Sequence, residues 1–447
     1  MPFWSGKKEI DNKRTLALLY MNKKIFLFVF ALFSVVYTVF SQQTTESPYS
    51  YYGIGELNPE GTVEERAMGG IGIFADSTRV NMQNPATLSH LKLTAFSGGA
   101  SFDYKKIVSN VTKIGTNSTS VDYVMLGFPI VDKLGFAAGL IPLSSVGYKL
   151  ASRQTIDGVA QLNQFEGNGN VNQFFISSGY EIYKGLSFGA SLKFNFGKIE
   201  MKDLLKISNV DFYTQEDSKS SLRGVSANFG LHYTKSLKNK LRISSSLVFT
   251  PESKLNSNNE RVVSTFGNAN AGNNSSLIVK ETQVKDLEAI GLKETKLTLP
   301  SQFEVGFGVG KDLQWFAGVE YTHSNTEKFS NPFLSATNVK YENGYKIALG
   351  GFYVPQYNSI SSYWKRVTYR AGFRYEKTGI MLNNQSIDDF GISFGLSFPV
   401  RGFSNLTTGF EFGQKGTLKQ NLIKENYFNF KIGITLNDKW FQRTKYQ

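Results

Sequence analysis

The chain of 447 residues contains no cysteine and little histidine or proline, with three and eleven residues respectively. Without cysteine it can form neither a disulfide framework nor a thiolate metal site. The three histidines, His90, His232 and His323, lie far apart in the sequence, and no serine or aspartate spacing marks any of them as catalytic. We therefore predict no enzyme, no metal centre and no cofactor.

The charge pattern excludes a further class of partner. The formal net charge is +13, but lysine and arginine are spread along the chain without a basic run. Such charges are typical of solvated loops and barrel interiors, so we predict no nucleic-acid partner. The slightly negative mean hydropathy also excludes a bundle of membrane helices.

Glycine, phenylalanine and tyrosine are abundant, with 42, 37 and 22 residues, and this composition favours strands. From about residue 91 onward, apolar and small or polar residues alternate with period two. In 386–398, for example, Phe390, Ile392 and Phe394 alternate with glycine and serine, and 186–197 and 426–436 repeat the pattern. Each segment therefore has one apolar face and one small or polar face.

This alternation is typical of a soluble sandwich or of a membrane barrel. The segments have about 10–16 residues, whereas strands of globular proteins average about five or six and membrane strands need about 9–11. About fourteen segments occur, and short connections alternate with generally longer ones, as in bacterial outer-membrane barrels. We therefore predict an all-β, antiparallel transmembrane barrel over 91–441, with both ends periplasmic. The expected long extracellular loop, 251–299, is either a ligand-capping loop or a tolerated insertion, and 442–447 form a periplasmic tail.

The amino end has the layout of an export signal. Residues 21–41 read MNKKIFLFVFALFSVVYTVFS, two lysines followed by an uncharged apolar run. A membrane anchor is the alternative, but the run is short for a spanning helix. We predict a signal peptide over 21–41, with Gln42 as the new amino end. Residues 1–20 fit no signal layout, and we interpret them as an overcalled start.

Residues 42–90 lie outside the strand pattern and contain the glycine-rich stretch RAMGGIGIFADSTRVNMQNPATLSH. A phosphate-binding loop is one interpretation, but the Gly-Lys-Ser/Thr that such a loop requires is absent. A barrel of about fourteen strands is wider than side chains alone can fill. We therefore predict that 42–90 form a hatch or plug in the lumen, either movable or fixed. Its motif residues are Gly69, Gly70, Gly72, Asn84, Pro85 and Ala86.

Pro142 interrupts the third predicted barrel strand, 135–150. Proline cannot donate to a strand ladder, so it indicates a bulge or a local break. In a membrane barrel, an unpaired stretch must be buried or must line a wet cavity. Pro142 therefore indicates either a lateral opening in the barrel wall or a strand that ends early near the rim.

A row of arginines follows the predicted strand 363–377. If Phe373 and its alternate neighbours face lipid, then Arg366, Arg370 and Arg374 face inward, as does Glu411 on another strand. An inward arginine ladder could hold a carboxylate ligand, because guanidinium offers a bidentate fork. The alternative is a structural role, in which these arginines pair with luminal glutamates or with acidic residues of the hatch.

The arrangement resembles the outer-membrane long-chain fatty acid transporter family of the FadL/TodX type. The resemblance rests on the signal peptide, the strand count, the Gly-rich lead-in Met68–Gly72 and the motif Asn84-Pro85-Ala86. The closing segment KENYFNFKIGITLNDKWF also resembles hatch-bearing barrels of gliding and gut Gram-negative bacteria, a Bacteroidota-like feature. The family implies that a hydrophobic ligand enters at the outer loops and leaves sideways through a kinked third strand, where Pro142 lies.

Two functions remain open. The first is passive, hatch-gated uptake of hydrophobic, long-chain fatty acid-like molecules across the bacterial outer membrane, with that ligand and membrane lipids as partners. The second is a non-transporting barrel that acts as a subunit or scaffold of an outer-membrane secretion or assembly complex. An apolar lumen with a side gap near Pro142 favours the first, and a lumen full of paired arginine and glutamate favours the second. Two departures from the family bear on the ligand. The first outer loops contain no apolar helical pair, and the chain continues past Leu436.

Overall fold

The computed structural model describes residues 45–268, 277–334, 338–400 and 404–439. The predicted start segment 1–20, the predicted signal peptide 21–41 and the predicted tail 442–447 lie outside these residues. Among the described residues, no helix is both long enough and apolar enough to cross a membrane.

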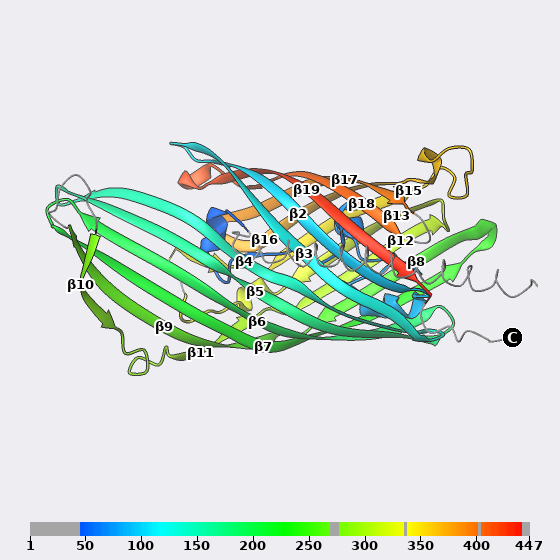
Figure 1. The fold of residues 1–447 in the computed structure, drawn as a ribbon, viewed down its shortest axis with the longest axis horizontal. Helices are drawn as coiled ribbons and strands as arrows, with labels where there is room; N and C mark the ends of the chain where they lie inside the picture. The colour runs from blue at the N-terminus through cyan, green and yellow to red at the C-terminus, as the bar shows by residue number, and fades with distance from the viewer. Residues whose placement is uncertain (1–44, 269–276, 335–337, 401–403, 440–447) are drawn as a thin grey trace, which may run out of the picture. The chain divides into compact units, whose positions relative to one another are not determined.

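The described chain forms a closed antiparallel β-barrel of fourteen wall strands, which confirms the predicted fold (Figure 1). Closure comes from the last strand, β19, which pairs with the first wall strand, β2, from Asp438↔Thr94 to Lys424↔Val108. The first seven wall positions are occupied by β2 (Thr94–Val108), β3 (Lys113–Val131), β4 (Leu134–Ile156), β5 (Val159–Tyr183), β6 (Leu186–Ile207), β7 (Phe212–Ser236), and β8 (Leu241–Thr250) continued by β9 (Ser253–Asn268). The other seven are occupied by β11 (Glu294–Leu299) continued by β12 (Gln302–Lys311), β13 (Trp315–Ser324), β14 (Val339–Tyr341) with β15 (Gly344–Tyr353), β16 (Thr368–Leu382), β17 (Gln385–Pro399), β18 (Asn405–Gly416) and β19 (Lys424–Asp438).

The alternation along the strands sorts apolar side chains to the outside of the barrel. Phe174, Phe194, Phe307, Phe394 and Ile432 are all more than one third exposed, although they are large and apolar. A continuous band of this kind on every wall strand is the surface that a membrane barrel turns to lipid. Within the described residues the remaining elements are the strands β1 (Glu56–Leu57) and β10 (Leu277–Val284) and a set of short helices, namely η1 (Pro48–Tyr51), α2 (Val63–Arg66), η2 (Pro85–His90), η3 (Lys238–Lys240), η4 (Thr326–Lys328), η5 (Trp364–Arg366) and η6 (Lys419–Asn421).

The range 251–299, predicted as one long loop, contains β9, β10 (Leu277–Val284) and β11, and most of it extends the wall. In β9, Leu255, Ser257 and Asn259 are buried and alternate with exposed neighbours. Both faces of this segment are largely polar, because a strand above the lipid needs no apolar face. The pattern of apolar alternation could not detect it. The strand is interrupted between β8 and β9 at Pro251 and between β11 and β12 at Pro300, because proline has no backbone N–H to donate to the strand ladder.

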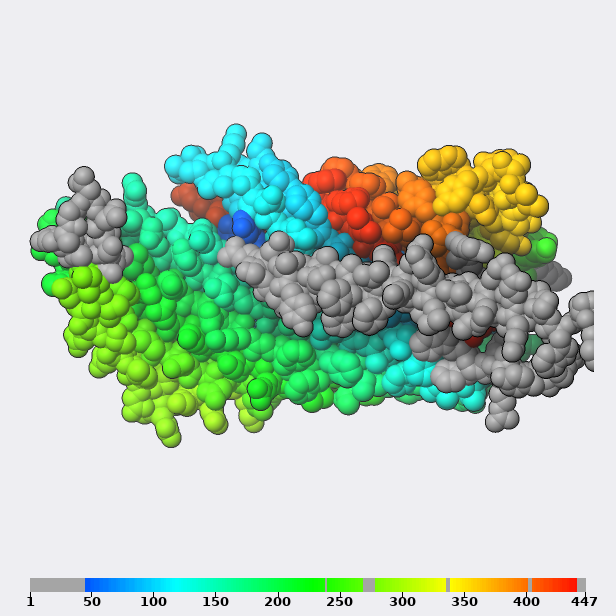
Figure 2. Space-filling view, viewed as in Figure 1, coloured from blue at the N-terminus to red at the C-terminus, as the bar shows by residue number. Residues whose placement is uncertain are grey.

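The wall is much taller on one side than on the other. Strands β4 to β7 have 22 to 25 residues, about twice the length needed to cross a bilayer. Figures 1 and 2 show this tall wall, in teal and green, extending beyond the orange and red strands. We name the end with the tall wall the long-strand end and the opposite end, where turns such as that at Lys184 are short, the short-turn end.

Candidate functional site

The first feature of the site is a seam between β3 and β4. These two strands pair from Val131↔Leu134 only as far as Val124↔Leu140. Beyond that point β3 pairs only with β2, and β4 pairs with β5 and, at two positions, with a short strand inside the barrel. Pro142 lies two residues past the last β3–β4 pair, and a bulge follows it before Ser144. The residue singled out by sequence therefore lies where the wall separates.

The seam is filled from inside by the chain's own amino-terminal part. We name residues Thr45–Leu93, which precede β2, the luminal segment, and residues Thr45–Asn58 within it the seal. In the seal, β1 (Glu56–Leu57) pairs antiparallel with β4 through Glu56↔Ser145 and Leu57↔Ser144. The Asn58 N–H also donates to the Leu143 carbonyl over 2.9 Å. In Figure 2, blue atoms of this part of the chain are visible between the cyan β2–β3 strands and the teal β4–β5 strands. The seal thus occupies part of the edge of β4 that β3 leaves free.

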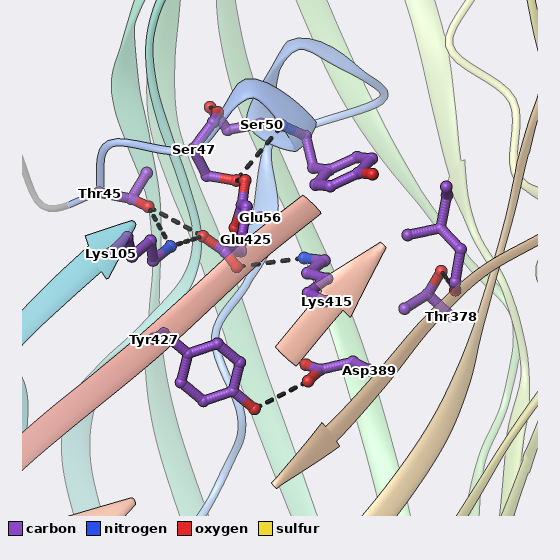
Figure 3. Close-up of polar contacts among 12 residues, drawn as sticks. Thr45, Ser47, Ser50, Glu56, Lys105, Thr378, Asp389, Lys415, Glu425 and Tyr427 are labelled. Atoms are coloured by element: carbon purple, nitrogen blue, oxygen red, sulfur yellow. Dashed lines mark hydrogen bonds and ion pairs between the residues drawn. The ribbon is translucent and has the colours of Figure 1, made fainter. Parts of the chain in front are cut away.

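A buried cluster of charged residues attaches the seal to β2, β18 and β19, the wall strands on the other side of the seam from β4 (Figure 3). The carboxylate of Glu56 accepts from Lys105 of β2 at 2.6 Å, from Lys415 of β18 at 3.1 Å and from the Thr45 hydroxyl at 2.8 Å. Burial alone would raise the pKa of Glu56, but the two lysines outweigh it and hold the pKa well below its usual range. One carboxylate of the seal therefore binds two lysines of the wall.

A second carboxylate completes the cluster. Glu425 of β19 is fully buried, and its Oε1 accepts from the Ser47 hydroxyl over 2.6 Å. The Tyr49 hydroxyl donates to the carbonyl of Ile423, and Lys415 lies 5.7 Å from the centre of the Tyr49 ring. Two carboxylates and two ammonium groups are therefore brought together in one buried cluster.

Beneath the seal lies an apolar cluster in the long-strand half of the lumen. Ile54 and Tyr51 of the seal contact a group of wall residues drawn from several strands. The buried wall residues of this cluster are Val146, Tyr148, Val171, Ile199, Leu222, Leu255 and Leu297. The seal therefore covers an apolar surface of the kind that a hydrophobic ligand would contact.

The middle of the luminal segment contains α2, which begins with a complete capping box. Thr62 accepts from the Glu65 N–H, and the Glu65 carboxylate accepts from the Thr62 N–H over 2.7 Å. Arg66 approaches Asp122 of β3 to 3.4 Å, and Glu64 accepts from Thr407 of β18 over 2.8 Å. These contacts hold α2 against strands on both sides of the β19–β2 closure.

Glu65 provides a prediction about pH. Burial raises the pKa of Glu65 to about 8, and the neighbouring Glu64 contributes in the same direction. In the unfolded chain this carboxyl ionises near its ordinary value of about 4.3. Its contribution to stability is therefore complete below about pH 4.3 and is lost as the pH rises to about 8, by up to about 1.4 kcal/mol per pH unit.

A Glu65→Gln variant keeps the cap but cannot ionise, so its stability is expected to vary less with pH than that of the wild type between pH 5 and 8. Proteolysis of the luminal segment at pH 5, 7 and 9 measures the difference. An identical pH dependence in the two proteins would show that Glu65 is not the responsible group.

The predicted hatch motif packs directly on glycines of the wall. Many wall glycines lie so close to the luminal segment that a Cβ atom on any of them would overlap it. Those that face backbone or side-chain atoms of α2, η2 and the turns beside them include Gly135, Gly179, Gly189, Gly230, Gly350, Gly372 and Gly395. Asn84 caps η2 through the Ala86 N–H and donates from Nδ2 to the Leu231 carbonyl over 3.1 Å, and the Pro85 carbonyl faces Gly179. The motif therefore seats η2 at the short-turn end.

The glycines of the motif have separate roles. Gly69 has a left-handed φ of +73° and donates its N–H to Ser393 Oγ over 2.9 Å, with Gly372 opposite. Gly70 also has a positive φ, +83°, but open space surrounds its Cα. Gly72 donates to Glu320 of β13 over 2.9 Å. Backbone freedom is thus required at Gly69 and Gly70, and close approach at Gly69.

A Gly372→Ala variant is expected to destabilise the seating of the luminal segment by about 1–3 kcal/mol, because its Cβ would overlap backbone atoms of Met68 and Gly69. The measurement is the apparent melting temperature of the folded barrel by heat-shifted gel mobility. Gly98→Ala serves as the control, since a Cβ there meets its nearest atom at 3.8 Å. Equal melting temperatures for the two variants would contradict close packing at Gly372.

The predicted arginine ladder divides into three different environments. Arg374 of β16 donates to Glu411 at 2.9 Å, to Asp389 at 3.1 Å and to the Tyr427 hydroxyl at 2.7 Å. Arg370 is buried and donates to Ser397, but it forms no ion pair with any described residue. The prediction for Arg366 is wrong: β16 begins only at Thr368, and Arg366 is exposed in η5, with its guanidinium 5.2 Å from the Tyr363 ring.

The ladder is therefore a structural ion-pair network at Arg374. Glu411 accepts from both Arg374 and Lys431, the latter at 2.6 Å, so it is fully paired. Sequence reasoning missed Glu56, Lys105, Lys415 and Glu425. The inward positions of Lys105 and Lys415 could have been found from the period-two alternation of the strands, whereas Glu56 lies in an irregular segment where this alternation does not apply.

The histidines take no catalytic arrangement. His90 and His232 lie edge to face with ring centres 5.2 Å apart, and His232 Nε2 lies 3.1 Å from the Ile73 carbonyl. Across the described ranges, no three histidine, aspartate or glutamate side chains are grouped as a metal would require.

Comparison with known proteins finds solved structures with a similar fold. The solved structure of CymD, described as a monoaromatic hydrocarbon channel, is similar with a TM-score of 0.54 and 16% identity, covering 87% of this chain and 99% of that chain. The Ralstonia pickettii toluene transporter TbuX has a TM-score of 0.55 at 14% identity, with coverage of 85% and 99%. A Pseudomonas aeruginosa FadL homologue has a TM-score of 0.56 at 10% identity, with coverage of 86% and 100%.

At these identities the likeness establishes the fold, which is that of outer-membrane channels of the FadL/TodX type. A search of curated proteins gave no match. The family described as BamG matches residues 21–447, which is nearly the whole sequence. This chain therefore belongs to the BamG family.

Proposed function

We propose that this chain is an outer-membrane channel that takes up hydrophobic, long-chain fatty acid-like molecules and releases them sideways through the β3–β4 seam. The single observation that carries the proposal is the seam itself, which begins at Val124 and Leu140 inside the apolar band and is filled, among the described residues, by the chain's own seal. The fold, shared with proteins described as a hydrocarbon channel and a toluene transporter, supports this proposal.

In this proposal the long-strand end is extracellular and the luminal segment is the gate. The apolar cluster under Tyr51 and Ile54 offers a hydrophobic surface to the ligand when the seal moves away. The part of the segment around η2 stays seated at the short-turn end, held by the wall glycines. Only the seal then has to move, and its attachment includes the β1–β4 pairing, the hydrogen bonds of Ser47 and Ser50 to Gly147 of β4, and the Glu56 cluster.

The test is uptake of radiolabelled oleate and toluene by cells that express the chain, compared with cells carrying an empty vector. Uptake above the vector level supports a channel, and the preferred substrate distinguishes a fatty acid from a small hydrocarbon. Deleting residues 49–90 is expected to raise permeability to hydrophobic antibiotics if these residues are a plug. Unchanged permeability in a barrel that still shows heat-shifted mobility would count against it.

A second candidate function is a non-transporting barrel that acts as a subunit or scaffold of an outer-membrane complex. The observation that favours it is the set of ion pairs inside the barrel, such as Lys193–Glu60 and Arg66–Asp122, which join the luminal segment to the wall. Mass spectrometry of the protein extracted in mild detergent separates the two candidates. Bound lipid without partner polypeptides supports uptake, and stoichiometric barrel partners without lipid support the scaffold.

A further inference from the structure

A second polar site lies on the inner face of the tall wall, apart from the seam and the seal's charge cluster. Asp203 of β6 and Glu216 of β7 are direct cross-strand partners, and Phe165 of β5 is the partner of Asp203 on its other side. Two carboxylates placed directly opposite each other repel one another. Such a pair needs a cation nearby.

Of the two carboxylates, only that of Glu216 forms an ion pair with a described residue. Glu216 pairs with Arg261 of β9 at 3.0 Å, and the Arg261 guanidinium also lies 4.9 Å from the Phe333 ring. Asp203 forms neither an ion pair nor a hydrogen bond with any described residue, and its Oδ1 is buried. The two undescribed segments after β9 and before β14, 269–276 and 335–337, contain no lysine or arginine.

Three aromatic side chains lie near the carboxylate of Asp203: Phe165, its cross-strand partner, and the neighbouring Tyr51 and Tyr148. The ring of Tyr51 lies 5.2 Å from that of Tyr148 and 6.0 Å from that of Phe165, centre to centre. Tyr148 is only 3% exposed, yet its hydroxyl has no hydrogen-bond partner among the described residues. The outer edge of the Tyr148 ring and its hydroxyl lie over Gly167 of β5, two residues from Phe165 on the same face of that strand. The site therefore contains a buried acceptor without a donor and aromatic faces that attract cations.

Phe165, Asp203 and Glu216 line a hollow of about 180 Å³, together with Asn163, Leu205 and Thr214. For scale, a cavity of about 150 Å³ holds a benzene molecule. The hollow therefore admits the end of a side chain but not a whole peptide or a lipid tail. Its lining combines apolar walls with a carboxylate, which suits a short apolar stem that ends in a positive charge.

We propose that this hollow binds an ammonium or guanidinium group carried on a short apolar stem, with Asp203 as its counter-ion and the Tyr148 hydroxyl as a hydrogen-bond acceptor. A lysine or arginine side chain of a polypeptide, or a free alkylamine, has this chemistry. The residues that line the hollow all belong to β5, β6 and β7, so the hollow does not require the β3–β4 seam to open. It gives the extracellular rim a recognition point for a cationic ligand.

The test is binding of Nα-acetyl-lysine amide to the full barrel in detergent, measured by calorimetry against Nα-acetyl-norleucine amide, which lacks the ammonium group. We expect saturable binding of the lysine compound, at least tenfold weaker binding of the norleucine compound, and at least tenfold loss in an Asp203→Asn variant. Asp217→Asn is the control, because Asp217 follows Glu216 directly and faces the other side of the sheet; it should change the affinity less than twofold. Tighter binding of acetyl-lysine amide than of n-butylamine assigns the site to a polypeptide side chain, and the reverse assigns it to free amines.

Equal affinity for the charged and neutral compounds, or an unchanged affinity in Asp203→Asn, would overturn the proposal. Failure to fold is not expected for this variant, since removing one of two opposed carboxylates relieves repulsion. Its melting temperature gives a second readout. The variant should be at least as stable as the wild type, and it should lose the further stabilisation that acetyl-lysine amide gives the wild type.

Discussion

Replacing Arg374 with alanine is expected to destabilise the barrel by more than about 3 kcal/mol, because it leaves Asp389 without its ion-pair partner and Glu411 with Lys431 alone. Arg374 contacts Glu411 and Asp389 as well as the Tyr427 hydroxyl, and it therefore joins β16, β17, β18 and β19. The loss should be measured as a lower midpoint of urea unfolding in detergent. An Arg374→Lys variant should recover part of it, since lysine restores the charge but not the planar fork.

Arg366→Ala is the matched control on the same stretch of chain. Arg366 is exposed and lies over the Tyr363 ring, so its loss is expected to change stability by less than about 0.5 kcal/mol. If the three arginines formed one inward ladder, the two alanine variants would lose similar amounts. A large loss for Arg366→Ala would therefore contradict the environments that the structure assigns to the two residues.

Replacing Glu56 with glutamine is expected to release the seal. Lys105 and Lys415 would both lose their shared carboxylate, at a cost of about 3 kcal/mol or more. Since about 1.4 kcal/mol corresponds to a tenfold change in an equilibrium, the fraction of molecules with a detached seal should rise by about a hundredfold. The seal should then be cleaved faster by a protease added to the folded barrel, and permeability to hydrophobic antibiotics should increase.

Glu46→Gln provides the control for this effect. Glu46 belongs to the seal but forms no ion pair with any described residue, so its replacement should leave cleavage and permeability unchanged. Equal cleavage rates in Glu56→Gln and the wild type would show that the charge cluster does not hold the seal. Faster cleavage in both variants would show that any loss of charge from the segment has this effect.

The barrel could be predicted from the sequence because its lipid-facing positions must be apolar, as Phe390, Ile392 and Phe394 illustrate. That requirement ends where the membrane ends. The upper part of β5 and most of β9 carry polar residues on both faces, and their alternation of burial is not visible in residue types. Sequence reasoning therefore gave the number of wall strands correctly but underestimated the height of the wall.

The site was predictable only in part, for a related reason. Pro142 and the glycines around Gly69 have backbone properties that indicate a break or a close approach wherever they occur. Glu56 has no such property, and its role depends on Lys105 and Lys415, which lie on strands distant in sequence. The position of the strand end also mattered. Strand 363–377 was predicted to begin five residues before β16 does, so the period-two alternation was extended to Arg366 and assigned its side chain to the barrel interior.

The most direct test of the central claim, that the seal closes the β3–β4 seam, is a reversible lock between the seal and β4. Leu57 and Ser144 are opposite one another in the antiparallel β1–β4 pair, so their Cα atoms lie within the range that a disulfide can bridge. The chain contains no other cysteine, so a Leu57→Cys/Ser144→Cys variant forms one defined bond. Uptake of oleate or toluene is then measured in oxidised and reduced cells. We predict that oxidation abolishes uptake and that a reductant restores it, and unchanged uptake by the fully oxidised protein would contradict the account.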